Sequence, residues 1–352
     1  MKIFLIFILL LSGVFFSFSQ IPSGYYDSAS GLNGLSLKIA LHNIIKNHII
    51  ISYDNLHDYY IYTDKKPNGK VWDIYSDNPG GTPPYEYNFI AADQCGNYSG
   101  EGDCYNKEHT WPKSWFGGEI SPMYSDLFIV YPTDGYVNGI RSNNPYGEVN
   151  SPSWTSMNGS KSGNCSFSGY SQGAFEPIDE YKGDLARTFF YISVRYYGED
   201  GSWPGSAQTN GAELSAWALN MMYQWHSNDP VSPKETDRNN AVYQIQNNRN
   251  PFIDHPEWID SVWHPLHIPL VLSNINDIRI FPNPSDNYIN VNCNDEIYRI
   301  EIYNSLGIIV CSFDNIESSS HIIDISKNPS GYYYIYIFSE KNRYIKKITI
   351  IR

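Results

Sequence analysis

The order of hydrophobic and polar residues divides this chain into three parts. Residues 3–11 form an unbroken apolar run near the start. In residues 20–270, segments with apolar residues at helical spacing alternate with stretches rich in Gly, Asn, Pro and Tyr. Residues 276–352 are short strand-like runs separated by turn residues. This pattern predicts an N-terminal leader, a mixed helical domain and a small all-β domain.

Residues 1–19 have the features of a secretory signal peptide. Lys2 precedes the apolar run, and the small residues Ser17 and Ser19 stand at the positions that a signal peptidase recognises. The polar segment that follows contains no stop-transfer signal, so an uncleaved membrane anchor is the less favoured alternative. Because no later segment is apolar for long enough to span a bilayer, we expect export through the periplasm and a secreted or cell-surface protein without a membrane span.

Three segments of the mixed domain carry helix signals. The clearest is a capping box in which Ser232 is the N-cap, Pro233 begins the helix and Glu235 stands three residues after the cap. A further helix start is predicted at Asp254, with Glu257 at the third position. The three predicted helices cover residues 35–49, 184–197 and about 233–247.

The segment between the first two helices is irregular. Residues 66–180 are rich in Gly, Asn, Pro and Tyr and contain only short strand-like runs such as 127–131. Loops of this kind often carry the functional residues of a domain, because binding and catalytic side chains are placed there by a rigid scaffold. We therefore expect the functional site in this segment.

The C-terminal part has the pattern of a β domain. Residues 299–302 alternate between polar and apolar side chains, and strand-like runs recur at a spacing of roughly 8 to 12 residues. This pattern predicts a small β-sandwich. The segment contains no group of residues suited to catalysis.

The composition excludes one class of nucleic-acid-binding protein. The chain has 352 residues, with 24 Lys and Arg against 37 Asp and Glu and a net charge of -13. Nonspecific affinity for phosphates comes from Lys and Arg that displace counterions, so a strongly basic, charge-driven binder is excluded. An enzyme that contacts a phosphate locally is compatible with this charge.

The cysteines predict disulfide bonds, because an exported protein folds in an oxidising compartment. Cys95 and Cys104 lie nine positions apart in a Gly-rich loop and are the first predicted pair. Cys293 and Cys311 are a second candidate pair, which leaves Cys165 unpaired.

Two neighbouring segments hold the residues best suited to chemistry. Glu108 and His109 are adjacent, and Asn138 follows His109 by 29 positions in a polar, Gly-flanked segment. An imidazole supplies a general base, while a carboxylate and an amide supply oxygen ligands for Mg²⁺, which needs only one or two protein ligands. Adjacent side chains of a strand point to opposite faces, so Glu108 and His109 could share a site only at a strand end or in irregular backbone.

These segments resemble the bacterial endonuclease I family of secreted and periplasmic nonspecific nucleases. The similarity rests on EHTWP at 108–112, VNGIRSN at 137–143, FEP at 175–177 with KGDLAR at 182–187, and NRNPFIDHP at 248–256. The resemblance implies an α+β fold, a mixed helical nuclease domain with a ββα-metal motif. It also implies an endonuclease that hydrolyses phosphodiester bonds in DNA, with RNA as an alternative substrate.

The resemblance implies a role for three residues. His109 would activate water as the base, and Glu108 and Asn138 would hold one Mg²⁺, with Ca²⁺ or Mn²⁺ as alternatives. Arg141 and Arg187 are candidates for binding substrate phosphates, because a guanidinium pairs with phosphate oxygens through two hydrogen bonds. We expect the protein to act as a monomer.

The chain departs from the family pattern just behind the predicted site. Asp126 is expected to support the metal ligands through hydrogen bonds, and the family often places a His or Asn within two positions after Asp126-Leu127. This chain has Phe128 and Ile129 there. One supporting hydrogen bond is therefore expected to be missing, which affects the expected rate more than the reaction class.

The β domain resembles the C-terminal sorting domain of the type IX secretion system. The similarity rests on FPNP at 281–284, IYNSLG at 302–307, PSGYY at 329–333 and a basic, strand-like end. It implies the type IX secretion machinery as a partner. A generic carbohydrate-binding or adhesive sandwich is the alternative.

Several other patterns are weaker. GYSQG at 169–173 matches the nucleophile elbow of serine hydrolases, but no buried strand is expected before it. His264 and His267 lack the further ligands of a zinc site, and His42 and His48 do not share a helix face well. The alternative to a nuclease is a catalytically inactive, secreted surface or glycan-binding protein on the same scaffold.

Overall fold

The computed structural model separates the chain into two units. It describes residues 21–263, 278–304, 309–339 and 343–351. The first unit is Met1–Leu266 and the second is His267–Arg352. The predicted signal peptide lies outside the described residues. Among the described helices, none has both the length and the apolar character that crossing a bilayer requires.

The first unit has the α+β fold that the sequence predicts. Its helices are α1 (Gly34–Ile45), α2 (Leu56–Thr63), α3 (Gly135–Arg141), α4 (Lys182–Arg195), α5 (Ala216–Asn228), α6 (Pro233–Gln246), α7 (Pro251–Asp254) and α8 (Trp258–Trp263). Its strands are β1 (Tyr105–His109), β2 (Val130–Asp134), β3 (Pro152–Thr155), β4 (Lys161–Asn164), β5 (Gly173–Glu176), β6 (Thr209–Asn210) and β7 (Glu213–Leu214). They form three small antiparallel sheets, β1-β2, β3-β4-β5 and β6-β7.

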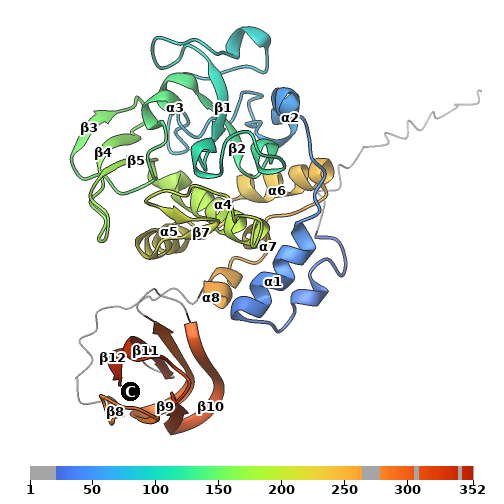
Figure 1. The fold of residues 1–352 in the computed structure, drawn as a ribbon. Helices are drawn as coiled ribbons and strands as arrows, with labels where there is room; N and C mark the ends of the chain where they lie inside the picture. Colours follow the sequence, from blue (N-terminus) through green and yellow to red (C-terminus); the bar gives the residue numbers. More distant parts are fainter. Residues whose placement is uncertain (1–20, 264–277, 305–308, 340–342, 352) are drawn as a thin grey trace, which may run out of the picture. The chain divides into compact units, whose positions relative to one another are not determined.

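Helix α4 is at the centre of the first unit. All of its residues are buried, and it contacts α1, α5 and α7. Figure 1 shows it in the middle of this unit, with α5 beside it. Leu185, Phe189, Phe190 and Ile192 supply apolar contacts, and the charged residues of the helix that are also buried, Lys182, Asp184, Arg187 and Arg195, form ion pairs.

The three predicted helices are confirmed. α1 ends at Ile45 rather than at residue 49, and α4 begins two residues before the predicted start. α6 begins with the predicted capping box, in which Ser232 Oγ accepts from the Glu235 backbone N–H and the Glu235 carboxylate accepts from the Ser232 N–H. Asn247 ends α6 in the left-handed conformation, with a φ of 60°.

Two local predictions are wrong. The strand expected at 127–131 is displaced to β2, because Asp126 Oδ1 accepts a hydrogen bond from the Phe128 N–H (3.0 Å) and holds these residues in a turn. Asp254 does not cap a helix. It is the last residue of α7, and its carboxylate accepts from Nε and Nη2 of Arg249 at 2.6 and 2.7 Å.

Strands β1 and β2 and helix α3 form the predicted ββα unit. The two strands are antiparallel, with Glu108 opposite Tyr131. α3 follows β2 directly, because Asp134 ends the strand and caps the helix by accepting from the Val137 N–H (2.8 Å). The helix therefore lies against the strand that carries the candidate site residues.

The second unit is all-β, as predicted. Its strands are β8 (Ile278–Phe281), β9 (Tyr288–Asn304), β10 (Ile309–Asp324), β11 (Gly331–Ser339) and β12 (Arg343–Ile350). They form one antiparallel sheet in the order β10-β9-β11-β12, and β8 pairs with β9. Alternate residues such as Ile300, Ile302, Ile335 and Ile337 face one core. The sheet curves around this core, and the long strands β9 and β10 shift register where they bend (Figure 1).

One of the two predicted disulfides is present. Cys95 and Cys104 are bonded, with their Cα atoms 5.5 Å apart. Cys165 is free, as predicted, but Cys293 and Cys311 are free as well. The second prediction is wrong because Cys293 lies beside β8, whereas Cys311 pairs with the opposite end of β9.

The disulfide-bonded loop packs onto the start of α3. Tyr98 from this loop lies over Gly135, where an added Cβ would come within 2.7 Å of the Tyr98 ring and 3.2 Å of Cys95 Sγ. Glycine is therefore required here by the close approach of the loop. This contact fixes the helix of the ββα unit against the loop that precedes β1.

Gly135→Ala is expected to destabilise the protein by about 1–3 kcal/mol, because the added methyl group overpacks the contact with Tyr98 and the disulfide. Urea unfolding followed by circular dichroism measures this loss. The double variant Gly135→Ala/Tyr98→Ala should recover part of it, since removal of the ring opens space. A Gly135→Ala protein as stable as the wild type would contradict the tight contact.

His57 in α2 is a poorly solvated histidine. Its ring packs edge-on against Tyr60 and Tyr105, and its Nδ1 has no hydrogen-bond partner within the described part of the chain. Burial, followed by the charge of Lys107, lowers the pKa of His57 to about 4. The folded protein therefore keeps this imidazole neutral at pH values where an unfolded chain protonates it.

As the pH falls from about 6.5 to about 4, His57 gains a proton in the unfolded chain but not in the folded protein. The stability that depends on a neutral His57 is thus present above this range and is lost within it. The wild type should lose stability relative to His57→Phe on acidification. Unfolding free energies of both proteins near pH 7.5 and near pH 5 measure the effect, and an unchanged difference would contradict it.

Candidate functional site

Glu108 lies at the interface between β1 and α3. Its side chain is 3% exposed, and its Oε1 accepts hydrogen bonds from Arg141 Nη1 and from the Tyr75 hydroxyl, both at 2.8 Å. Burial raises the pKa of Glu108 above the ordinary value, although the Arg141 charge and these hydrogen bonds oppose that rise. The carboxylate is therefore stabilised by buried protein donors rather than by water.

Arg141 connects the last turn of α3 to the end of β1 through hydrogen bonds. Its guanidinium is fully buried and donates to the backbone carbonyls of His109 (2.9 Å), Thr110 (2.7 Å) and Asn144 (3.2 Å) as well as to Glu108. Every nitrogen of the guanidinium thus has a protein partner. In this arrangement Arg141 positions the strand end and does not present an N–H group to a substrate phosphate.

His109 points to the other face of β1. Its Nε2 lies 2.9 Å from the backbone carbonyl of Tyr124. Because a carbonyl oxygen only accepts hydrogen bonds, Nε2 carries the proton and Nδ1 carries the lone pair. Burial is the main cause that lowers the pKa of His109 to about 4, so the imidazole is neutral at pH 7.

Two tyrosines fix the plane of the His109 ring. Tyr53 and Tyr124 lie nearly parallel to it, with centroid distances of 5.6 and 5.5 Å. Lys107 Nζ lies 4.4 Å from the Tyr53 ring centre and Lys113 Nζ 5.2 Å from the Tyr124 ring centre. The neutral imidazole is therefore held in an aromatic layer with cations at its edges.

Asn138 lies on α3, one turn before the last helical residue. Its Nδ2 donates to Asn106 Oδ1 at 2.8 Å, and Asn106 shares a face of β1 with Glu108. The interface between β1 and α3 thus offers one carboxylate and two amides. Oxygen donors of this kind suit a hard divalent cation, so the residues present fit the Mg²⁺ that the family resemblance implies.

Such a cation would have few protein ligands. Within the described ranges, no group of three or more His, Cys, Asp or Glu side chains could hold a metal ion. A zinc site needs three or four such ligands, whereas Mg²⁺ keeps several of its waters. The donor set therefore favours a hydrated, oxygen-bound cation.

The structure brings these residues to the predicted strand end. Glu108 and His109 are the last two residues of β1. Their side chains still point to opposite faces, Glu108 toward Arg141 and His109 toward Tyr53 and Tyr124. The carboxylate and the imidazole thus lie on opposite faces of β1, at the end of the strand.

Arg187 lies in a buried ion network instead of a substrate surface. Its guanidinium is fully buried and donates to both carboxylate oxygens of Glu235, to the Asp229 carbonyl (2.8 Å) and to His226 Nδ1 (3.1 Å). Because each of its nitrogens has a protein partner, it offers no N–H group to a phosphate here. The structure thus gives both predicted phosphate-binding arginines internal partners.

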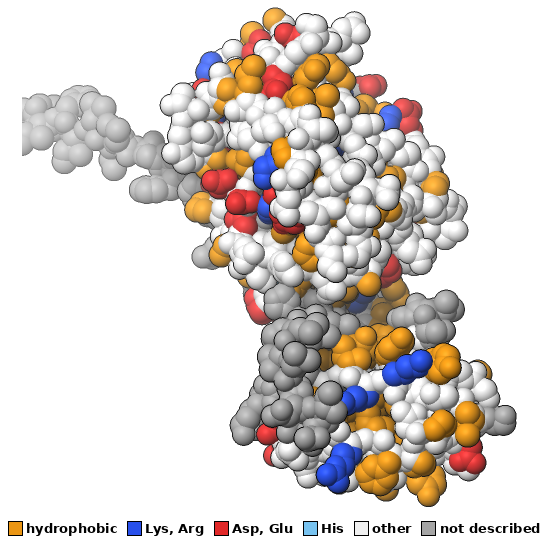
Figure 2. Space-filling model, turned by 90° about the vertical axis from the view of Figure 1, so that its left-hand side faces the viewer, with side chains coloured by type: hydrophobic (Ala, Val, Ile, Leu, Met, Phe, Trp, Pro, Cys, Tyr) orange, Lys and Arg blue, Asp and Glu red, His pale blue; other side chains and the backbone are white. Residues whose placement is uncertain are grey.

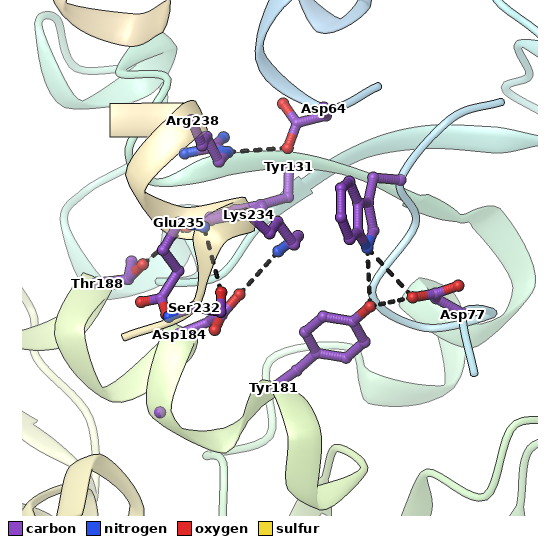
Figure 3. Close-up of polar contacts among 12 residues, drawn as sticks. Asp64, Asp77, Tyr131, Tyr181, Asp184, Thr188, Ser232, Lys234, Glu235 and Arg238 are labelled. Atoms are coloured by element: carbon purple, nitrogen blue, oxygen red, sulfur yellow. Dashed lines mark hydrogen bonds and ion pairs between the residues drawn. The ribbon is translucent and has the colours of Figure 1, made fainter. Parts of the chain in front are cut away.

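The same network joins α6 to α4 and to β2 (Figure 3). Lys234 Nζ contacts Asp184 at 2.7 Å, and Arg238 Nε contacts Asp64 at 2.8 Å. The Arg238 guanidinium also lies 3.8 Å from the ring centre of Tyr131, the residue opposite Glu108 in β2. These contacts connect β2, the strand that pairs with β1, to α6.

Asp126 supports a turn rather than the candidate metal ligands. Its carboxylate is 1% exposed and accepts from the hydroxyls of Tyr191 (2.8 Å) and Tyr196 (2.9 Å), from Gln246 Nε2 (3.0 Å) and from the Phe128 N–H. Burial alone would raise its pKa, but these hydrogen bonds and a nearby histidine lower it below the ordinary value. Phe128, the departure from the family pattern, contributes its backbone to this turn.

The remaining sequence patterns have structural roles or lie elsewhere. Residues 169–173 form a turn between two strands, so the helix that follows a nucleophile elbow is missing from this described segment. His42 Nδ1 contacts the carbonyl of Val194 at 3.0 Å, and His48 Nδ1 accepts from Arg195 Nε at 2.9 Å. His264 and His267 lie outside the described residues.

Sequence reasoning missed the aromatic residues around the site. Tyr53 and Tyr124 stack on each other beside His109, and Tyr75 and Tyr146 lie beside Glu108. These tyrosines come from separate loops, and the 30 tyrosines of the chain give no local pattern that distinguishes them. Only the tertiary fold brings them to the site.

Comparison with known families covers both units. Residues 33–257 match the profile of the family described as Endonuclease I. Residues 279–351 match the secretion system C-terminal sorting domain. The first match includes every candidate site residue, and the second identifies the all-β unit as a type IX sorting domain.

Several similar proteins are secreted nucleases. An extracellular ribonuclease of Bacillus amyloliquefaciens is 36% identical over 246 residues, which cover 68% of this chain and 78% of that protein. A protein of the same description from Bacillus subtilis is 34% identical over the same shares. A periplasmic deoxyribonuclease of Aeromonas hydrophila is 25% identical over 39% of this chain and 50% of its own length. This chain therefore belongs to the Endonuclease I family, as a secreted or cell-surface endonuclease that hydrolyses phosphodiester bonds.

Proposed function

We propose that this endonuclease uses His109 as its general base and a divalent cation held by Glu108 and Asn138. The observation that carries the proposal is the hydrogen bond from His109 Nε2 to the Tyr124 carbonyl, which leaves Nδ1 unprotonated. A general base needs a lone pair at working pH and a fixed direction in which to use it. The buried, stacked imidazole meets both requirements.

His109 Nδ1 takes a proton from the water that attacks the scissile phosphate. The ring becomes positively charged in this step, and the Tyr124 carbonyl accepts from Nε2–H and stabilises that charge. The stacked Tyr53 and Tyr124 rings keep Nδ1 pointing in one direction. Positioning of this kind lowers the barrier, because the reacting groups need not be reoriented.

Glu108 and Asn138 would hold the cation through a carboxylate and an amide oxygen. A divalent cation held there would supply positive charge to neutralise the phosphate and to stabilise the leaving oxygen. Mg²⁺ is the favoured ion because it needs few protein ligands, with Ca²⁺ and Mn²⁺ as alternatives. Arg141 favours the ionised form of Glu108 against the effect of burial and orients its carboxylate, whereas the sequence predicted a phosphate contact for this arginine.

The substrate is DNA, with RNA as a second substrate. The relatives include proteins described as ribonucleases and as deoxyribonucleases, which motivates an enzyme that acts on both. On the face drawn in Figure 2, Lys and Arg side chains of the first unit are scattered among acidic ones. With a net charge of -13, contact with nucleic acid is therefore local to the site, and we propose a monomer that meets one phosphate at a time.

His109→Ala should lower kcat by roughly 10² to 10⁴-fold, the usual contribution of a general base. Divalent-cation affinity should stay close to that of the wild type, because the imidazole is not a proposed ligand. Plasmid and RNA cleavage with and without EDTA, together with a cation titration, measure both quantities. His42→Ala is the matched control, since it also removes a buried imidazole that contacts a backbone carbonyl. Wild-type turnover in His109→Ala would refute the assignment of the base.

Asn138→Ala should raise the divalent-cation concentration needed for half-maximal cleavage. The expected rise is at least about 10-fold, the effect of losing a residue that merely orients a metal ligand. Asn143→Ala is the control, because Asn143 is exposed just after the same helix. The measurement is cleavage rate against Mg²⁺ and Mn²⁺ concentration. Identical titrations for the two variants would place the cation elsewhere.

A further inference from the structure

Tyr75 is a buried residue whose hydroxyl reaches the candidate site. Its side chain has no exposed surface, and its hydroxyl lies 2.8 Å from Glu108 Oε1. An ionised carboxylate only accepts hydrogen bonds, so Tyr75 is the donor. Arg141 donates to the same oxygen from the opposite element, α3. The orientation of Glu108 is therefore set by two donors, of which only Arg141 belongs to the ββα unit.

A second tyrosine fixes the direction of this hydrogen bond. The Tyr146 hydroxyl lies 2.7 Å from the Tyr75 hydroxyl. Because the single hydrogen of Tyr75 is donated to Glu108, the hydrogen between the two tyrosines comes from Tyr146. The bonds run in one direction from Tyr146 through Tyr75 to Glu108, and each strengthens the next. The Arg141 guanidinium lies 4.3 Å from the ring centre of Tyr146 and holds that tyrosine in place.

The backbone around Tyr75 is tied to the start of α3. Asp73 Oδ1 accepts from the Tyr75 N–H at 2.8 Å, and Asp73 Oδ2 accepts from the Asp134 N–H at 2.9 Å. Asp134 is the N-cap of α3, which carries Asn138. One buried carboxylate thus links the segment that orients Glu108 to the helix that carries the second proposed ligand.

We infer that Tyr75 is a positioning residue, which sets the Glu108 carboxylate relative to Asn138 so that the two oxygens can bind one divalent cation. The inference rests on the proposed function, in which these two residues are the ligands. Residues that orient a metal-binding carboxylate typically contribute about 10- to 100-fold to metal affinity. The cation and the carboxylate must meet in a fixed geometry, and a carboxylate free to rotate loses part of that affinity.

The test is Mn²⁺ binding to the full-length protein without substrate, measured by electron paramagnetic resonance. Tyr75→Phe removes only the hydroxyl and should weaken Mn²⁺ binding by about 10-fold or more. Its kcat at saturating Mn²⁺ should stay near the wild-type value, because His109 is unchanged. Tyr146→Phe should weaken binding less, since the bond from Tyr75 to Glu108 is kept. Tyr60→Phe is the matched control: Tyr60 is equally buried, and its hydroxyl has no hydrogen-bond partner among the residues described.

A mutant cycle separates positioning from general stability. In a Glu108→Gln background, Tyr75→Phe should cause no further loss of Mn²⁺ affinity, whereas a merely structural role would add the same loss in both backgrounds. If Asn138→Ala loses Mn²⁺ binding while Tyr75→Phe binds like the wild type, the inference fails and the proposed metal site stands. If the wild type itself binds no Mn²⁺, both fail. Unfolding curves show which variants are folded. If Tyr75→Phe does not fold, the Mn²⁺ affinity of Tyr146→Phe still tests the inference.

Discussion

The site depends on one buried ion pair, between Arg141 and Glu108. Both side chains are almost completely removed from water, at 0% and 3% exposure, so neither charge is hydrated. Desolvation of two ions is costly, and removal of one partner from such a pair typically costs about 3–5 kcal/mol, roughly a fifth or more of the stability of a domain. The pair is tolerable because the guanidinium also donates to three backbone carbonyls, those of His109 and Thr110 at the end of β1 and that of Asn144 after α3. The guanidinium therefore pairs with the Glu108 charge and with backbone carbonyls at the same time. A shift of α3 would break both the ion pair and these hydrogen bonds.

The alternation of side chains along β1 places the proposed metal ligand Glu108 and the proposed base His109 in different environments. Glu108 faces α3 and a polar, buried interface, while His109 faces an aromatic layer formed by Tyr53 and Tyr124. The first environment supplies donors that favour an ionised carboxylate, whereas burial in the second disfavours an imidazolium more than the hydrogen bond to the Tyr124 carbonyl favours it. Two adjacent residues of one strand thus have opposite electrostatic surroundings. A helix in this place would put both side chains on overlapping faces and could not separate them so sharply.

Local signals in the sequence predict some of these features and not others. The capping box at Ser232 and the pairing of Cys95 with Cys104 depend on residues close together in the chain, and both are found in the structure. The proposed role of His109 and the presence of the ββα unit are both predicted from short motifs. The burial of Arg141 could not be predicted, because the sequence around an arginine at a helix end does not show whether its side chain faces a phosphate or a carboxylate. Tyr75 is 33 residues from Glu108, and only tertiary packing joins them.

The low basicity of His109, the proposed base, follows from the same burial that fixes the direction of its ring. The desolvation that lowers its pKa to about 4 keeps Nδ1 unprotonated over a wide range of pH, which suits an enzyme that works outside the cell. The same desolvation makes the imidazole a weaker proton acceptor in the resting protein. In the proposed mechanism the negative charge of the bound phosphate enters this low-dielectric site, where an imidazolium beside that charge would be stabilised far more than in water. The basicity of His109 therefore rises when substrate is present, and the Tyr124 carbonyl is already in place to accept from the ring as it becomes charged.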